Sequence, residues 1–401
     1  MNSVNMSIIM EEIFKLIKKC DLSDELKLMN SNEFAKLLQQ KNSFIDFKEK
    51  DCATILGIDK KMIIHSHLTF NENSLTFTSD KGIKHTIKYI YLHINQTNLN
   101  DNKPGLGRLI LFLLIFGSFR QNYDYILTNI IDNKTTEILQ TFGFEKLSLT
   151  NCFDLPVNEI KQQFNVIYQL KDLFSGSKII YIALLLNKMF NKICGEDEYI
   201  FDSNEFTWTI EFKEKWKLIR DEYLNYSKDN EIPLHKSINS IIADPDKLNK
   251  WNTLYLRAYG NDTDVCEKFP ETMKLINKIP CTLANFSVLQ PGAKIEKHVG
   301  LYKGILRYHL GLVIPKDYKN CFININDEKY FWKEGKNLIF DDVVDHSVEN
   351  NTNEERIILF LDIKRDFKNI YYNAINNLFL EIIQNSKFIN EIINNVNKLN
   401  K

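Results

Sequence analysis

Residues 281–315 of the chain read CTLANFSVLQPGAKIEKHVGLYKGILRYHLGLVIP. Short stretches in which apolar and polar residues alternate are separated here by turn residues, of which Pro291-Gly292 is the clearest pair. Similar short strands and turns follow one another across residues 252–362. Because regular spacing of this kind is typical of two packed antiparallel sheets, we expect a double sheet in this part of the chain.

Two histidines stand out within this region. His298 follows the Pro291-Gly292 turn, and His346 lies on what we expect to be a separate strand. Neutral imidazole is a suitable ligand for Fe(II) and other divalent metals, so two rings that meet would form a metal site. The common non-haem iron site adds a carboxylate two residues after the first histidine, but here that residue is Gly300. The pair alone is therefore a weak signal.

Residues suited to a small dicarboxylate lie close to this pair in the sequence. They are Ser287, Arg307, His309 and Arg356. Arg356 begins an apparent strand on which alternation would point its guanidinium inward, toward a carboxylate that it could bind with two hydrogen bonds. A buried arginine without an anion would cost several kcal/mol, which favours an anion-binding role.

Several blocks of sequence now carry a resemblance. They are Phe286-Ser-Val-Leu-Gln-Pro-Gly292, Lys297-His-Val-Gly300, Arg307-Tyr-His-Leu-Gly-Leu-Val-Ile-Pro315, Trp332-Lys-Glu-Gly-Lys336 and Phe340-Asp-Asp-Val-Val-Asp-His346, preceded by Trp216-Lys-Leu-Ile-Arg-Asp-Glu222 and Cys266-Glu-Lys-Phe-Pro-Glu-Thr272. In order and approximate spacing they resemble the aspartyl/asparaginyl β-hydroxylase family. Linked blocks are far more specific than any one of them.

The resemblance implies a distorted double-stranded β-helix and an Fe(II)- and 2-oxoglutarate-dependent oxygenase that consumes O2. The family has a two-histidine metal site with glycine where related enzymes have the acid, so His298 and His346 would bind the iron and Gly300 fits the pattern. A metal with no carboxylate ligand keeps an extra position. A halide could compete there, so halogenation is a minor alternative to hydroxylation.

The same resemblance implies roles for the polar residues named above. Ser287 and Arg356 would bind the distal carboxylate of 2-oxoglutarate, and Arg307 with His309 would bind its keto-acid end. In the family pattern, further cations that hold an acidic substrate stand two residues before Arg307 and two residues before Ser287. This chain has Ile305 and Asn285 at those positions, which argues for a less acidic target such as an amide.

We expect the substrate to be an Asp or Asn β-carbon in a peptide or protein. A small metabolite or an acyl chain is the alternative within the same chemistry. Asp341, Asp342 and Asp345 flank His346 and would either orient its ring or form turns. Trp251 and Trp332 are expected in the core, and His65, His67, His85, His93 and His235 are expected to be ordinary, mostly solvent-facing residues without a metal.

The N-terminal part carries a second, weaker resemblance. An expected strand at 85–95 is followed by Asn102-Lys-Pro-Gly105-Leu-Gly107 and an apolar helix, which is similar to the pyrophosphate-binding turn of the GNAT acetyltransferase superfamily. The resemblance implies that Gly105 and Gly107 would bind an acyl-CoA through backbone N–H groups. Asn102 departs from the usual Gln or Arg. An acyltransferase or adapter protein with an auxiliary oxygenase domain, or a degenerate docking platform, is thus the alternative of a different class.

The length of 401 residues suits more than one domain. We expect an α+β protein with an N-terminal α/β GNAT-like domain at 1–155, a helical connector at 156–195, a cupin-like double-stranded β-helix at 196–367, and C-terminal helices at 368–401. The connector is predicted to consist of two apolar helices, at 157–173 and 178–194, separated by Ser175-Gly-Ser177 and closed by Gly195.

The composition limits the partners. Hydrophobic residues make up 44% of the sequence and charged residues 26%, as in ordinary globular proteins. With 51 basic and 52 acidic residues the formal net charge is −1, so no overall field attracts nucleic acid. The seven cysteines contain no Cys-x-x-Cys pair and no apolar run approaches the ~20 residues of a membrane span. These features predict a cytoplasmic protein without a membrane span.

Overall fold

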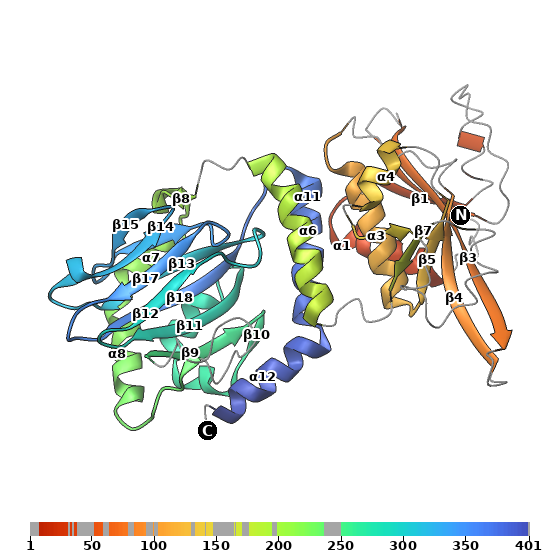
Figure 1. Cartoon of the computed structure of the whole chain (residues 1–401). Helices are drawn as coiled ribbons and strands as arrows, with labels where there is room; N and C mark the ends of the chain where they lie inside the picture. The colour runs from red at the N-terminus through yellow and green to blue at the C-terminus, as the bar shows by residue number, and fades with distance from the viewer. Residues whose placement is uncertain are drawn as a thin grey trace. The chain divides into compact units, whose positions relative to one another are not determined.

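The structure is a computed structural model of the chain (Figure 1). It describes residues 8–30, 33, 36–37, 52–58, 64–78, 84–93, 99, 103–129, 133–140, 142–146, 164, 166–170, 176–194, 199–235 and 250–399. The chain divides into two compact units. Met1–Leu173 with Phe367–Asn377 form the first, and Phe174–Asp366 with Leu378–Lys401 form the second. Within the described residues, no helix combines the length and apolar character needed to cross a bilayer.

The first unit is built on one mixed sheet. Its described strands lie in the order β1-β2-β3-β4-β5-β7-β6, and among them only β4 and β5 run parallel. The strands are β1 (Leu26–Asn30), β2 (Ala53–Ile58), β3 (Ile64–Thr78), β4 (Lys84–Leu92), β5 (Tyr125–Thr128), β6 (Glu145–Lys146) and β7 (Val166–Gln169), and the helices are α1 (Ile8–Lys19), α3 (Leu106–Arg120) and α4 (Asn133–Gln140). Helix α3 connects β4 to β5 and packs on β2 and β3.

One predicted helix of this unit is wrong where the structure describes it. Residues Val166–Gln169, expected inside a helix at 157–173, form strand β7, which pairs antiparallel with β5. Val166, Ile167 and Tyr168 are β-branched or aromatic and all three are buried. Pairing across the sheet buries these side chains, which suits residues of this kind better than a helix does. The rest of that predicted helix lies largely outside the described residues.

The second unit contains two antiparallel sheets in its described residues. A larger sheet has the order β10-β9-β11-β18-β13-β16-β8 and a smaller one the order β12-β17-β14-β15. The strands are β8 (Ile200–Phe201), β9 (Trp251–Ala258), β10 (Asn261–Asp262), β11 (Cys281–Leu289), β12 (Lys294–His298), β13 (Ile305–Val313), β14 (Cys321–Ile325), β15 (Glu328–Phe331), β16 (Asn337–Phe340), β17 (His346–Asn350) and β18 (Arg356–Lys364). The double sheet and the α+β class predicted from the sequence are present.

Strand β18 shows how the larger sheet separates two environments. Ile357, Leu359, Leu361 and Ile363 point into a core that the sheet shares with helices. Ile358 and Phe360, which alternate with them, join a second core that includes Ile323 of β14 and Val348 of β17. Because successive residues of a strand point to opposite faces, Arg356 lies on the face that looks toward the smaller sheet. This alternation was predicted from the sequence.

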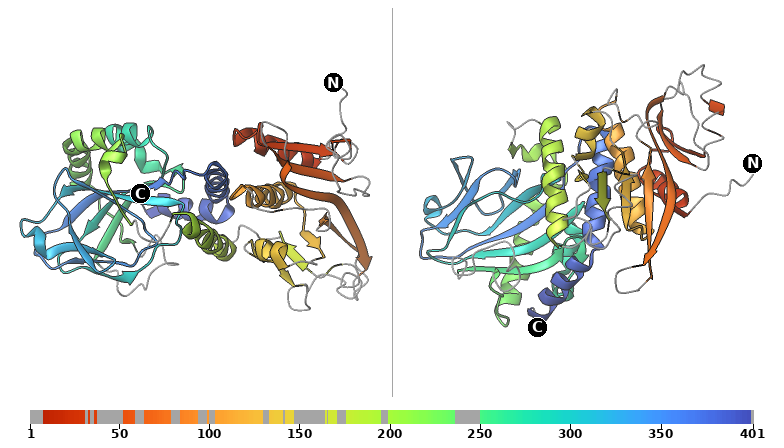
Figure 2. Two further views of the ribbon diagram at one scale, coloured as in Figure 1. Left: turned by 90° about the horizontal axis from the view of Figure 1, so that it is seen from above. Right: turned by 45° about the vertical axis from the view of Figure 1, so that its right-hand side comes forward.

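Helices cover the outer face of the larger sheet. They are α7 (Thr209–Glu214), α8 (Trp216–Ser227) and α10 (Pro270–Ile276), joined by the 3₁₀ turns η3 (Ser203–Glu205) and η4 (Asp264–Lys268), while η5 (Tyr318–Asn320) precedes β14. The left view of Figure 2 shows the green and teal helices on one side of the strands. Lys215 separates α7 from α8.

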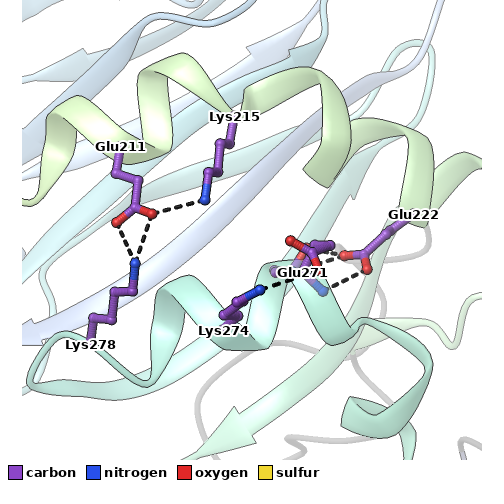
Figure 3. Close-up of polar contacts among 7 residues, drawn as sticks. Glu211, Lys215, Glu222, Glu271, Lys274 and Lys278 are labelled. Carbon is purple, nitrogen blue, oxygen red and sulfur yellow. Dashed lines mark hydrogen bonds and ion pairs between the residues drawn. The ribbon is translucent and has the colours of Figure 1, made fainter.

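Polar contacts fasten α7 and α8 to the segment around α10 (Figure 3). The Glu211 carboxylate accepts hydrogen bonds from Lys215 at 2.9 Å and from Lys278 at 2.7 Å. The Glu222 carboxylate accepts from the backbone N–H of Glu271 at 2.8 Å and of Thr272 at 2.9 Å. These two N–H groups lie in the first turn of α10, so Glu222 caps that helix from outside. Two of the sequence blocks that carried the resemblance are thus in direct contact.

The remaining helices lie where the sequence predicts helices. Helix α6 (Gly176–Cys194) corresponds to the second expected connector helix, and α11 (Ile370–Gln384) with α12 (Lys387–Leu399) corresponds to the expected tail. In the second unit, α6 approaches the loop after β12 because the Asn187 side chain donates to the carbonyl of Leu301 at 2.8 Å and accepts from the N–H of Lys303 at 2.8 Å. This contact fixes the chain just beyond His298.

Candidate metal centre

The two histidines singled out in the sequence meet. His298 ends β12 and His346 begins β17, and their Cα atoms are partners in the antiparallel ladder. The ring centroids are 4.2 Å apart, with 53° between the ring planes. Directly opposed residues of two strands place their side chains on the same face, which explains how a separation of many residues in sequence becomes a ring contact. The prediction that these imidazoles converge is met.

Both rings are held in the same way by the backbone. Nδ1 of His298 lies 2.8 Å from the carbonyl of Glu296, and Nδ1 of His346 lies 2.8 Å from the carbonyl of Val344. A carbonyl accepts, so each Nδ1 carries the hydrogen and each Nε2 keeps its lone pair. Burial, followed by the charges of nearby His298 and Arg307, lowers the pKa of His346 to about 3. His346 is therefore a neutral imidazole suited to a metal.

Gly300 has no side chain because another residue fills that space. A Cβ added to Gly300 would overlap with the carboxylate Oδ2 of Asp342. The backbone N–H of Gly300 also donates to the carbonyl of Asp342 at 2.6 Å. Any residue larger than glycine would displace the Asp342 side chain. Asp342 is thus the carboxylate that lies nearest to the place a ligand at position 300 would have in a three-ligand site.

The Asp342 carboxylate is paired with an arginine. Its Oδ1 forms an ion pair with Arg307 Nη1 and lies 3.4 Å from His346 Nε2. Arg307 also binds Asp362, with 3.1 Å between Nε and Oδ1. Burial raises the pKa of both carboxyl groups, while the Arg307 charge opposes that rise. One guanidinium is therefore shared by two buried carboxylates beside the histidines.

Arg356 lies deep on the face of the larger sheet that looks toward the smaller one. Only 2% of its surface is exposed, and its Nη1 contacts the carbonyl of Ser287 at 3.3 Å and the Ser287 Oγ at 3.4 Å. The Trp332 ring lies under the guanidinium, 4.5 Å from its carbon, and Trp251 donates to Ser287 Oγ at 2.9 Å. The expected pair of Ser287 and Arg356 is assembled.

The charge of Arg356 has no carboxylate partner among the described residues. Burial lowers its pKa to about 10, partly opposed by the thiol of Cys321. Its Nε, and the Nε2 of His309, are buried without a hydrogen-bond partner in the described part of the chain. Unpaired buried donors and charges are costly, so these two groups fit an anionic molecule that supplies acceptors. The residues present therefore fit a dicarboxylate such as 2-oxoglutarate.

His309 completes the arrangement. It is 4% exposed, and Trp332 Nε1 lies 3.4 Å from its Nδ1. Burial, followed by the charges of Arg356 and Arg307, holds the pKa of His309 well below its usual range. A neutral ring beside two arginines adds no charge of its own to repel a cation or an anion.

Among the described residues no group of three or more His, Cys, Asp or Glu side chains is arranged around a metal position.

Some residues matter more than the sequence indicated. Trp251 and Trp332 are in or beside the core as expected, but they also hold Ser287, Arg356 and His309 in place. Asp362 is not among the site residues predicted from the sequence, although it is on the same face of β18 as Arg356 and pairs with Arg307. Strand alternation was the signal that could have found it.

Other expected residues lie elsewhere. Asp341 binds Lys303 at 2.9 Å and Arg365 at 2.8 Å, and Asp345 pairs with Lys297 at 3.3 Å. A polar cavity of about 200 Å³ adjoins His346 and is lined by Lys297, Asn324, Asp327, Asp345, His346 and Ser347.

The expectation that the remaining histidines face solvent is wrong for His67, His93 and His235, which are buried. The side chains of His65 and His85 lie outside the described residues.

The glycines of the N-terminal turn are explained by packing. Gly105 precedes α3 with φ at 91°, and a Cβ there would lie 2.9 Å from the ring of Tyr372. A Cβ on Gly107 would overlap with the carbonyl of Leu99. Both positions therefore require glycine whatever the turn binds, and acyl-CoA binding stays a prediction. Asn102 lies outside the described residues.

Comparison with known proteins bears on the same region. Residues 213–366 match the family model described as aspartyl/asparaginyl β-hydroxylase, which confirms the resemblance drawn from the sequence blocks. Ornithine lipid ester-linked acyl 2-hydroxylase of Rhizobium tropici is 32% identical over 172 residues, 42% of this chain and 61% of that protein. Aspartyl/asparaginyl β-hydroxylase of Homo sapiens is 33% identical over 158 residues, 37% of this chain and 20% of that protein. The chain thus spans less than two thirds of the length of either hydroxylase.

Solved structures give only a distant likeness. The Cupin_2 domain of an XRE-family transcriptional regulator from Enterobacter cloacae has 10% identity and a TM-score of 0.22, with 29% of this chain and 100% of that chain covered. No argument rests on a likeness of this size.

Proposed function

We propose, from the match of residues 213–366 to the aspartyl/asparaginyl β-hydroxylase family, that the chain is an Fe(II)- and 2-oxoglutarate-dependent hydroxylase. In this proposal His298 and His346 hold the iron through Nε2. Ser287 and Arg356 bind the distal carboxylate of 2-oxoglutarate, and Arg307 with His309 binds the keto-acid end. The two-sheet unit is then a double-stranded β-helix of the cupin type, with the site between its sheets.

One observation carries the proposal. A buried arginine of the larger sheet, without a carboxylate partner among the described residues, faces the smaller sheet, which carries two converging imidazoles whose Nε2 atoms keep their lone pairs. A structural core has no need of such a cation, because replacing a buried charge by an apolar side chain is commonly neutral or stabilising. A dicarboxylate that binds near a metal would make use of both features.

The iron, with 2-oxoglutarate and O2, supplies the oxidation of an unactivated C–H bond. The chain's own residues do the rest. Arg356 and Ser287 orient the cosubstrate, and Trp332, packed under the guanidinium, limits access of water to it. Asp342 keeps a negative charge beside the imidazoles without occupying position 300, because Arg307 holds its carboxylate. Asp342 would thereby supply negative charge beside the two histidines that would hold the metal, without itself acting as a ligand.

A peptide or protein Asp or Asn β-carbon is the first candidate target, since the family match and the human relative point to it. A lipid acyl chain is the second candidate. The relative from Rhizobium tropici is named for that activity, and Val299 and Leu301, which follow His298, are 57% and 37% exposed. Apolar side chains at this place would suit a hydrocarbon substrate.

For the first unit we propose a GNAT-like domain that extends past the predicted boundary at 155, because β7 belongs to its sheet, and α6 supplies the helix of the predicted connector at 156–195. The support is local. Strands β4 and β5 are parallel, and the Gly105 turn and α3 connect them. Whether this unit binds acyl-CoA or serves as a docking platform is decided by titrating the full chain with an acyl-CoA and with desulfo-CoA.

The decisive experiment measures cosubstrate binding and turnover separately. The full chain is titrated anaerobically with Fe(II) and then with 2-oxoglutarate by calorimetry. Succinate and a product with one added oxygen atom are then measured over paired Asp and Asn peptides and over acyl amino acids. Saturable 2-oxoglutarate binding that needs His298 and Arg356 is expected. Absence of metal-dependent 2-oxoglutarate binding would overturn the proposal.

A further inference from the structure

The register of β13 and β18 places a lysine opposite the position where the family pattern has an arginine. Arg307 is the ladder partner of Asp362, and two residues away Ile305 is the partner of Lys364. Directly opposed residues share a face of the sheet, as do residues two apart on one strand. Arg307 binds Asp362 and also the carboxylate of Asp342, which lies beside His346. Ile305 and Lys364 therefore lie on the same face of the larger sheet as Arg307, the face that looks toward the histidines of the smaller sheet.

Lys364 is a cation without an assigned partner. It is half-buried and forms no ion pair with any residue that the structure describes. The neighbouring cations are committed, because Arg307 is shared by Asp342 and Asp362, and Lys303 and Arg365 both bind Asp341. In the proposed function Arg356 binds the cosubstrate.

The charges around the site reinforce this point. Arg307 and Arg356 balance Asp342 and Asp362 in number, and a divalent metal would balance the two carboxylates of 2-oxoglutarate. The loaded site is then neutral before any substrate arrives, and the charge of Lys364 is in excess on the same face. An anionic group on the substrate would complement it.

We propose that Lys364 is the cation that binds a carboxylate of the substrate, in place of an arginine at position 305. The proposal rests on the proposed function and deepens it by naming the residue that would select an Asp side chain over an Asn side chain. It also revises the expectation, drawn from Ile305 and Asn285, that the target is less acidic. The cation is present in this chain, but it comes from β18 and not from β13.

Asn285 supports a polar substrate on the same face. It is the ladder partner of Phe360, whose ring lies 4.4 Å from the Arg307 guanidinium. Asn285 is 3% exposed, and its Oδ1 has no hydrogen-bond partner among the described residues. A buried carbonyl oxygen that lacks a donor favours a ligand with an N–H group. An amino-acid residue offers both a carboxylate and an N–H, which a plain hydrocarbon chain does not.

The test compares peptides that differ only in Asp or Asn at the target position. Wild type, Lys364→Met, Lys364→Arg and the exposed control Lys319→Met are assayed for peptide binding under anaerobic conditions and for hydroxylated product. For Lys364→Met we expect KM for the Asp peptide to rise roughly 10- to 100-fold, the loss typical of a hydrogen bond to a charged group. Turnover of the Asn peptide should change little, and Lys364→Arg should restore most of the Asp preference.

Two outcomes separate failure of this inference from failure of the proposed function. If Lys364→Met binds 2-oxoglutarate normally but handles the Asp peptide as wild type does, the role of Lys364 is refuted and the oxygenase stands. The same conclusion follows if wild type prefers the Asn peptide, or binds neither peptide. If wild type does not bind 2-oxoglutarate in the presence of Fe(II), both proposals fail together.

Discussion

The two halves of the candidate site differ in how deeply they are built into the fold. His298 lies on β12, where most residues are exposed, whereas Arg356 starts β18, which is buried along most of its length. The histidine is held by one backbone carbonyl, but the arginine is packed against Trp332 and Ser287. His298 can therefore be replaced with little disturbance of the fold, whereas Arg356, like the buried His346, is part of the core. We therefore expect substitution of His298 to change activity but not stability, and substitution of Arg356 to change both.

The largest expected effect is on the exposed half. His298→Ala should abolish iron-dependent succinate formation, a loss of roughly 1,000-fold or more, because the metal loses one of its two protein ligands. The thermal unfolding midpoint of the metal-free protein should stay within about 2 °C of wild type, as is usual for a surface substitution. Lys294→Ala on the same strand is the control and should leave succinate formation intact. Equal activity in both variants would remove His298 from the site.

On the buried half the expected effects have opposite signs. Arg356→Met should weaken 2-oxoglutarate binding about 100-fold, since a bidentate partner of a carboxylate is lost. In the absence of cosubstrate the same variant should unfold in urea with a free energy about 1–3 kcal/mol higher, because an unpaired buried charge is replaced by a flexible apolar chain.

Arg356→Lys is the matched control for charge. It should lose cosubstrate affinity without any gain in stability, because the buried charge remains. A Met variant less stable than wild type would show that Arg356 already has its counter-charge within the fold.

An intermediate effect is expected where the two halves touch. Gly300→Asp adds the carboxylate of a three-ligand site, but its Cβ would overlap with Asp342. We expect a loss of about 1–3 kcal/mol in unfolding free energy, as for other overpacked sites, together with weaker iron binding. Gly300→Asp combined with Asp342→Gly should recover most of the stability. A stable single variant would mean that the Asp342 side chain is free to move aside.

The smallest effect is expected far from the chemistry. Glu222→Gln weakens the cap on α10 and should lower the unfolding free energy by about 1 kcal/mol, with cosubstrate binding unchanged. The exposed Glu214→Gln is its control. A loss of 2-oxoglutarate affinity in Glu222→Gln would show that the outer helices help to shape the site.

Strand pattern and residue chemistry predicted most of the second unit. The inward direction of Arg356 followed from alternation, and the meeting of His298 with His346 followed from placing each on a strand. The position of Asp342 could not be predicted, because it depends on the turn after β16 lying against the loop after β12. Neither segment carries a local signal of the other.

The first unit shows the opposite limit. Val166–Gln169 has apolar residues compatible with either a helix or a strand, and pairing with β5 decides between them. Likewise His67 and His93 were expected at the surface because composition favours that, yet the sheet buries them. Local preference is outweighed in both cases by partners that are distant in sequence.

Strand β18 carries Arg356, Phe360, Asp362 and Lys364 on one face. A single inserted or deleted residue within it would turn the residues on one side of the change to the opposite face, so that Arg356 and Lys364 could no longer both face the site. Insertions or deletions inside this strand would therefore disrupt the site. A single replacement at Lys364, at the other end of the strand, leaves Arg356 in place. Substrate preference can therefore change in evolution while cosubstrate binding is kept.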